Sequence, residues 1–121
     1  MILDSNILIG YLNGDQDIIS RVQSWRDTGV VLFISPVSAI EALSLASLTE
    51  ATVVATENFL NDFIIVPVDA RIIRTGSALR RAYRLSVPDA AIVATAIENK
   101  LPLATRDKKM RSVPGIVLVD I

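Results

Sequence analysis

The sequence contains no cysteine and no histidine. The absence of cysteine excludes disulfide bonds and thiol nucleophiles, and the absence of both residues excludes zinc sites built on them. Imidazole is equally excluded as a general base. An enzyme of this composition that works near neutral pH must take its base from a carboxylate with a shifted pKa or from water bound to a metal ion.

Long apolar runs are also absent. The apolar segments are short, as in VVLFI at 30–34, whereas a spanning helix needs about 20 apolar residues, so we expect no membrane segment. The N-terminus has no basic region followed by a cleavage site, so we expect no signal peptide. The hydrophobic fraction is nevertheless 51%. We interpret this surplus as a surface for a partner, either a second copy of the chain or another protein.

The chain has little net charge, −1, but its charges are unevenly distributed. Residues 1–60 contain two basic and seven acidic residues, and residues 61–121 contain ten basic and six acidic residues. This asymmetry allows a basic flank beside an acidic pocket. For any single arginine in this half, we favour the interpretation as part of an ordinary solvated helix face.

Segments typical of strands and helices alternate along the chain. The strand segments are dense in valine, isoleucine and leucine, which predicts a parallel sheet that is covered on both faces. Pro67 within one of them favours an edge position, because proline cannot donate to the ladder. We therefore expect a single α/β domain over residues 1–121, with three layers (α/β/α) around a mainly parallel sheet of about five strands. The expected strands are 1–3, 30–35, 64–68, 101–107 and 115–121, and the expected helices are 5–14, 15–29, 36–47, 49–63, 69–84 and 88–100.

Four acidic residues stand at places that a parallel sheet brings together. Asp4 and Asp107 end two of the predicted strands. Glu41 and Asp89 lie near the beginnings of two predicted helices. In an open parallel sheet, ligands bind outside the carboxyl ends of the strands, where the strand order reverses. We therefore expect the four carboxylates to converge on one pocket.

Each acid also has a local alternative. Asp4 is placed to cap the first helix, and Asp89 suits the positive end of a helix dipole. Asp107 suits a turn in TRDKK. Ser38 and Glu41 fit a capping box, although a helix that begins at 36 would already contain Ser38.

Gathering carboxylates without a counter-ion is costly, because like charges raise one another's pKa values. A divalent cation removes that cost. Oxygen-only ligands favour Mg²⁺ or Mn²⁺ over zinc or copper. Such an ion lowers the pKa of bound water and neutralises charge on a phosphodiester, so the pattern favours metal-dependent phosphodiester hydrolysis.

Four segments resemble the signature segments of PIN-domain ribonucleases and occur along the chain in the same order as in that family. The length and single-domain layout are similar to VapC-type toxins of prokaryotic toxin–antitoxin pairs. The resemblance implies a hydrolase, specifically an Mg²⁺- or Mn²⁺-dependent endoribonuclease that cleaves RNA by metal-activated water. It further implies a cytoplasmic toxin and inhibition by a cognate VapB-type antitoxin, while the apolar surplus predicts a homodimer. The segments are LDSNIL at 3–8, SPVSAIEAL at 35–43, PDAAIVATA at 88–96 and ATRD at 104–107.

The resemblance also assigns residues. The four acids match the family's acidic positions, and three of them are expected to hold the metal ion directly or through water. The stretch KKMRS after the last aspartate has no acid, which leaves one or two metal ions open. Its basic residues are expected to contact the RNA backbone. The catalytic acids are thus Asp4, Glu41, Asp89 and Asp107, the metal ligands Asp4, Asp89 and Asp107, the supporting polar residues Asn6 and Thr105, and the RNA contacts Arg106, Lys108, Lys109 and Arg111.

Other functions of this fold class fit less well. A non-catalytic PIN-like module of an RNA-processing assembly is the main alternative, although such a module has no reason to retain four repelling acids. A response regulator needs a phosphoacceptor aspartate at the end of a middle strand, where this chain has FIS. A haloacid-dehalogenase-like phosphatase needs D-x-D after the first strand, where this chain has DSN.

Overall fold

A computed structural model describes residues 1–45 and 47–121 of the chain. Its centre is a five-stranded sheet in the order β3-β2-β1-β4-β5, in which every neighbouring pair is parallel. The predicted parallel sheet is confirmed, and the strand that precedes Pro67 lies at an edge, as expected. The strands are β1 (Ile2–Leu3), β2 (Phe33–Ile34), β3 (Ile64–Ile65), β4 (Leu103–Thr105) and β5 (Leu118–Asp120).

Successive strand residues face opposite sides of the sheet, as the pleat requires. In β1, Ile2 packs into one buried cluster and Leu3 into another. In β4, Leu103 and Ala104 divide between the same two clusters. Both faces of the sheet are therefore apolar, which explains why the strands are continuous Val, Ile and Leu runs rather than alternating patterns.

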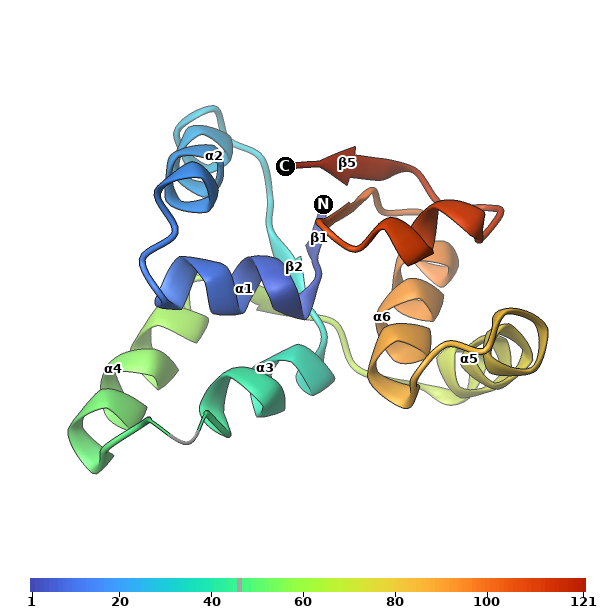
Figure 1. Cartoon of the computed structure of the whole chain (residues 1–121), viewed down its shortest axis with the longest axis horizontal. Coiled ribbons are helices and arrows are strands. Elements are labelled where there is room, and N and C mark those ends of the chain that lie inside the picture. Colours follow the sequence, from blue (N-terminus) through green and yellow to red (C-terminus); the bar gives the residue numbers. More distant parts are fainter. Residues whose placement is uncertain (46) are drawn as a thin grey trace.

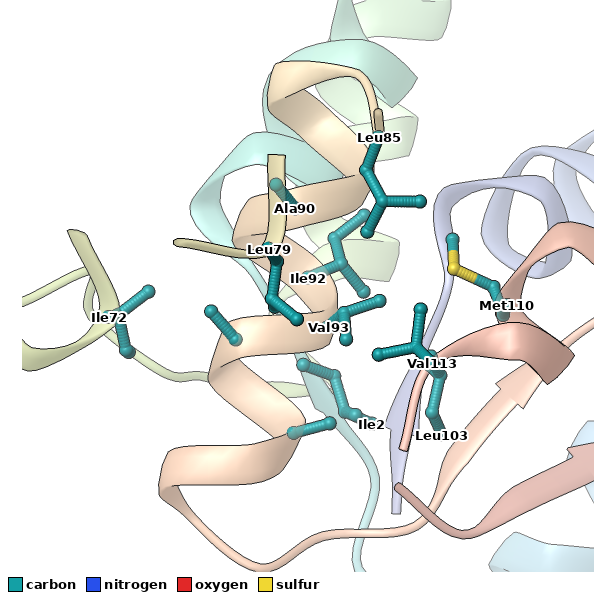
Figure 2. Packing of buried hydrophobic residues seen from close by; sticks show 12 residues of the cluster. Ile2, Ile72, Leu79, Leu85, Ala90, Ile92, Val93, Leu103, Met110 and Val113 are labelled. Carbon is teal, nitrogen blue, oxygen red and sulfur yellow. The ribbon is translucent and has the colours of Figure 1, made fainter. Parts of the chain in front are cut away.

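Helices cover both faces, which confirms the three-layer arrangement (Figure 1). Helices α5 and α6 cover one face together with a short 3-10 helix, η1, and α1 to α4 cover the other. Figure 2 shows the buried side chains of the α5–α6–η1 side packed around α6. The bounds are α1 (Ser5–Leu12), α2 (Gln16–Asp27), α3 (Pro36–Leu43), α4 (Glu50–Leu60), α5 (Ala70–Tyr83), α6 (Val87–Glu98) and η1 (Lys108–Ser112).

Several elements differ from the sequence-based expectation. All five strands are shorter than predicted, because only two or three residues of each pair with a neighbour. Helix α3 ends at Leu43 rather than at residue 47, and Ala46, which was included in the predicted helix, lies outside the described residues. The basic stretch after Asp107 forms η1, a turn of helix that the sequence did not predict. No helix among the described residues is long and apolar enough to cross a bilayer.

Candidate metal site at the carboxyl edge of the sheet

The strand order reverses between β1 and β4. From β1 the chain proceeds outward through β2 and β3 on one side, and β4 and β5 lie on the other. Leu3 pairs with Ala104, so the residues that follow them, Asp4 and Thr105, emerge side by side at the carboxyl edge. This is the place where doubly wound sheets bind ligands.

Asp4 is buried at this edge, with 3% of its surface exposed. Its Oδ1 accepts the backbone N–H of Ser5 at 2.8 Å, and its Oδ2 accepts the hydroxyl of Thr105 at 2.6 Å. Asp4 is also the N-cap of α1, so the local alternative is correct as well. Asparagine caps a helix equally well, and capping therefore does not account for a buried carboxylate here.

The pKa of Asp4 is raised from its usual 3.8 to about 6. Burial is the main cause, because it penalises the charged form, while the hydrogen bonds from Thr105 and Ser5 act in the opposite direction. The negative charges of Asp89 and Asp107 raise this pKa further. Three acids from β1, α6 and the end of β4 therefore share one electrostatic environment.

Thr105 connects Asp4 to Asp107. Its Oγ1 donates to Asp4 and accepts the backbone N–H of Asp107 at 2.9 Å. Asp107 in turn caps η1 by accepting the backbone N–H of Lys109 at 2.9 Å, so the predicted turn role is also real. The amide of Asn6 lies at the same place, with Nδ2 3.5 Å from Thr105 Oγ1. Both predicted supporting residues therefore lie beside the acids.

Ser5 connects Asp4 to Glu41. While its backbone N–H binds Asp4, its hydroxyl lies 2.8 Å from Glu41 Oε1 and 2.9 Å from the hydroxyl of Ser38. The Ser5 hydroxyl is placed to donate to either oxygen, so its single proton is shared between Glu41 and Ser38. Ser38 has none of its surface exposed. It lies inside α3, whose N-cap is Ser35, so the capping-box alternative is wrong.

Sequence reasoning did not select Ser5 or Ser38 as site residues. Their positions in the sequence could have indicated them as site residues, because Ser5 directly follows Asp4 and Ser38 lies one turn before Glu41 on α3. Only the packing of α1 against α3 brings the two hydroxyls together. Glu41, Asp4 and Asp107 are consequently joined by one chain of hydrogen bonds that runs through Ser5 and Thr105.

Asp89 joins the site by charge rather than by hydrogen bonds. It lies half-buried in the first turn of α6, where its backbone N–H donates to Ser86 Oγ at 3.2 Å. Within the described residues, its carboxylate makes no hydrogen bond to the other acids. Its position in the first turn agrees with the helix-dipole alternative, while its charge still acts on Asp4.

The side chains suit a hard divalent cation in their chemistry. All are oxygen donors, and the buried Asp4 with its raised pKa gains from a positive partner. Across the described part of the chain, no three acids lie close enough to enclose an ion by themselves. Mg²⁺ commonly retains several waters and takes only one or two carboxylates directly, so the residues fit an ion that is held partly through water.

The predicted RNA-contacting residues differ in their surroundings. Arg106 binds both carboxylate oxygens of Asp15, at 2.7 and 3.4 Å, and this contact lowers the pKa of Asp15. Arg111 pairs with Asp120 at 3.1 Å. Lys108 and Lys109 are exposed and form no ion pair within the described residues. The RNA contacts themselves stay predictions.

Comparisons with known proteins agree with the fold described above. The chain is similar to a chain of a toxin–antitoxin complex from Klebsiella pneumoniae, with 30% identity, a TM-score of 0.83, and coverage of 99% of this chain and 98% of that one. A DNA-bound VapBC from Salmonella typhimurium matches with 19% identity, a TM-score of 0.84, and 98% and 96% coverage. VapBC2 from Rickettsia felis, bound to a promoter DNA fragment, matches with 18% identity, a TM-score of 0.83, and 99% and 97% coverage.

The comparison with curated proteins found no match. The family model described as PIN domain matches residues 1–116, which confirms the resemblance seen in the four sequence segments. The chain belongs to the PIN domain family.

Proposed function

We propose that this protein is a metal-dependent endoribonuclease and the toxin of a VapBC-type toxin–antitoxin pair. Membership of the PIN domain family supports a nuclease, and the similarity to chains of toxin–antitoxin complexes supports the toxin role. The observation that carries the proposal is Asp4. Asp4 is buried and costly to ionise, and the charges of two further acids act on it. A bound cation would offset that cost.

Each residue of the hydrogen-bonded chain has a role in this proposal. Ser5 and Thr105 each bind one oxygen of Asp4 and so fix the plane of its carboxylate. Asp4, Asp89 and Asp107 would hold Mg²⁺ or Mn²⁺ directly or through water. When bound, the ion supplies positive charge at the scissile phosphate and lowers the pKa of water bound to it.

Among the described residues, the carboxylate of Glu41 accepts a hydrogen bond at one oxygen only. Ser5 binds its Oε1, so its other oxygen is available to orient the attacking water or to accept its proton. In-line attack by water on phosphorus would leave a 5′-phosphate and a 3′-hydroxyl. This mechanism needs no histidine, which the sequence lacks, because the water bound to the metal ion is the nucleophile and a carboxylate would accept its proton.

Partners are proposed on separate grounds. A cognate VapB-type antitoxin is supported by the VapBC complexes among the structural neighbours. A homodimer is supported by the number of exposed large apolar side chains, among them Ile40, Ile73 and Val87. RNA as substrate and a cytoplasmic location follow from the proposed activity.

The test is RNA cleavage with analysis of the product ends. Wild-type protein is incubated with single-stranded RNA in Mn²⁺, in Mg²⁺ and in EDTA. We expect cleavage only with metal, with 5′-phosphate and 3′-hydroxyl ends, and loss of cleavage in Asp107→Asn. The matched control is Asp17→Asn, which removes an exposed acid outside the site. Products with 2′,3′-cyclic phosphate, or cleavage that persists in EDTA, would show that the proposed mechanism is wrong.

A further inference from the structure

A cleft of about 530 Å³ opens between the end of α5 and η1, next to the acidic site. Its lining includes Asp89, which is also one of the acids that act on Asp4. The same lining contains three cationic side chains, Arg80, Arg84 and Lys109. The cleft therefore joins the candidate metal site to a basic surface.

The three cations of the cleft are not neutralised by the protein. Within the described residues none of them forms an ion pair, whereas Arg106 and Arg111 are each paired with an aspartate. Among the described residues that line the cleft, Asp89 is the one acid, and the metal ion would neutralise its charge. Three cations on one concave surface favour the binding of a polyanion. The RNA backbone is a polyanion, and RNA is the proposed substrate of the adjoining acidic site.

The walls of the cleft are fixed by the core. Arg84 ends α5 in the left-handed conformation, with φ of 54°, and its backbone N–H binds the carbonyl of Arg80. The next residue, Leu85, is buried in the same cluster as Met110 of η1 (Figure 2). Arg80 Nε donates to the carbonyl of Leu85 at 3.0 Å, which positions its guanidinium. The cleft is consequently preformed in the protein without a ligand.

One aromatic side chain also lines the cleft. Tyr83 is 38% exposed, whereas the other tyrosine, Tyr11, stacks on Phe59 with ring centroids 4.7 Å apart. An exposed aromatic ring beside unpaired cations is the combination by which proteins bind single-stranded nucleic acid, through base stacking and phosphate contacts. A base within a duplex could not stack on it, so the geometry favours an unpaired strand.

We propose that this cleft binds the RNA strand next to the scissile phosphate, with Arg84 and Lys109 contacting phosphates and Tyr83 stacking on a base. The proposal rests on the proposed ribonuclease function and names the surface that holds its substrate. It adds Tyr83 and Arg84 to the RNA contacts that the sequence predicts. It also separates Lys109, which lines the cleft, from Arg106 and Arg111, whose charges are already paired.

The test measures equilibrium binding of a short fluorescent single-stranded RNA of mixed sequence, by anisotropy, in EDTA and over a series of KCl concentrations. We expect Arg84→Ala and Lys109→Ala each to weaken binding and to reduce the slope of log K against log[KCl] by about 0.7, the value for one lost contact to a single strand. The matched control is Arg81→Ala. It removes the same charge from the neighbouring exposed position of α5, outside the cleft, and should leave the slope unchanged.

A second pair of variants tests stacking. Tyr83→Ala should weaken RNA binding roughly 5- to 150-fold, the range for loss of one stacked base, without changing the salt slope. Tyr83→Phe retains the ring and should bind like wild type. A role of Tyr83 through its hydroxyl would instead make the two variants equally weak, and the stacking assignment would be wrong.

The outcomes separate the two proposals. If wild type neither binds nor cleaves RNA in Mn²⁺, the ribonuclease function itself fails. If wild type cleaves RNA but Arg81→Ala reduces the slope as much as Arg84→Ala does, the cleft assignment fails and the ribonuclease function stands. If RNA binding is independent of Arg84 while a polyglutamate peptide binds in an Arg84-dependent way, the cleft is a protein-docking surface and the proposal is overturned.

Discussion

The N-termini of α1 and α5 are both capped by an aspartate, yet the two carboxylates have opposite electrostatics. Asp69 caps α5 by accepting the N–H of Ile72, and this hydrogen bond, aided by Arg71, lowers its pKa. Asp4 caps α1 by accepting the N–H of Ser5, and its pKa is raised to about 6. The local motif is the same in both places, and the difference comes from burial and from neighbouring charge.

That difference distinguishes a structural acid from a candidate functional one. Asp69 lies at the surface beside a cation, so its charge is stabilised where it stands. Asp4 lies at the strand-order reversal beside two further acids, so its charge is a cost to the apoprotein. A site that is electrostatically unfavourable without a ligand is typical of ligand binding.

The largest expected effect is on activity. Asp4→Asn retains a cap but loses a metal ligand, and we expect its RNA cleavage rate in Mn²⁺ to fall by more than the roughly 100-fold that loss of a side chain supporting a metal ligand costs. Asp69→Asn should cleave RNA at the wild-type rate. If Asp4→Asn and Asp69→Asn lose activity equally, the functional difference between the two aspartates is wrong, because equal losses would indicate a shared structural defect.

The same substitution should increase stability. At pH 7.5 in EDTA, Asp4→Asn removes a carboxylate whose pKa is about two units too high. Each unit corresponds to about 1.4 kcal/mol, so the free energy of unfolding should rise by up to about 3 kcal/mol. Urea unfolding measures the change. Asp69→Asn should slightly lower stability, since it removes a carboxylate that is favoured in the folded state.

The raised pKa of Asp4 also makes the free energy of unfolding depend on pH in a defined direction. Because the folded pKa of Asp4 is about 6 and its usual value is 3.8, the folded state binds the proton more tightly. Asp4 therefore lowers stability progressively as pH rises from about 4 to about 6, with the full cost present above about pH 7. Urea unfolding across this pH range should show that decline in wild type and a shallower one in Asp4→Asn. Identical profiles would contradict the raised pKa.

Smaller effects should come from the residues that orient the acids. Thr105→Val keeps the shape but removes the hydroxyl that binds Asp4 and accepts from Asp107. We expect Mn²⁺ affinity, measured by calorimetry, to fall roughly 10- to 100-fold, the usual cost of losing such support. Thr52→Val, which lies on α4 outside the site, is the control and should bind Mn²⁺ like wild type. Equal affinities in all three proteins would show that Thr105 does not position a ligand.

The sheet and the placement of its acids could be predicted because both follow from short-range patterns. Apolar runs indicate buried parallel strands, and an acid directly after such a run must lie at the carboxyl edge. Asp4 and Asp107 are examples, and Thr105 is next to Asp4 because Leu3 pairs with Ala104.

Contacts between distant residues could not be predicted in this way. Arg106 was expected on RNA, but Asp15, far away in the sequence, binds its guanidinium. Ser38 was considered only as a cap, because nothing in the local sequence indicates that α1 brings Ser5 against it. Nothing in the local sequence distinguishes Arg84 from the other arginines of residues 61–121, and only the fold places it beside η1 and Asp89.

The central claim is that the chain ends β1 on Asp4 in order to bind a metal ion, and thermal unfolding tests it most directly. Wild type and Asp4→Asn are each melted in EDTA and in saturating Mn²⁺. The account predicts that Asp4→Asn melts higher than wild type in EDTA. It also predicts that Mn²⁺ raises the melting temperature of wild type more than that of the variant. At a Mn²⁺ concentration of 100 times the dissociation constant, wild type should be stabilised by about 2.7 kcal/mol. If Asp4→Asn melts lower than wild type in EDTA and Mn²⁺ shifts neither protein, Asp4 is a structural cap and the account is contradicted.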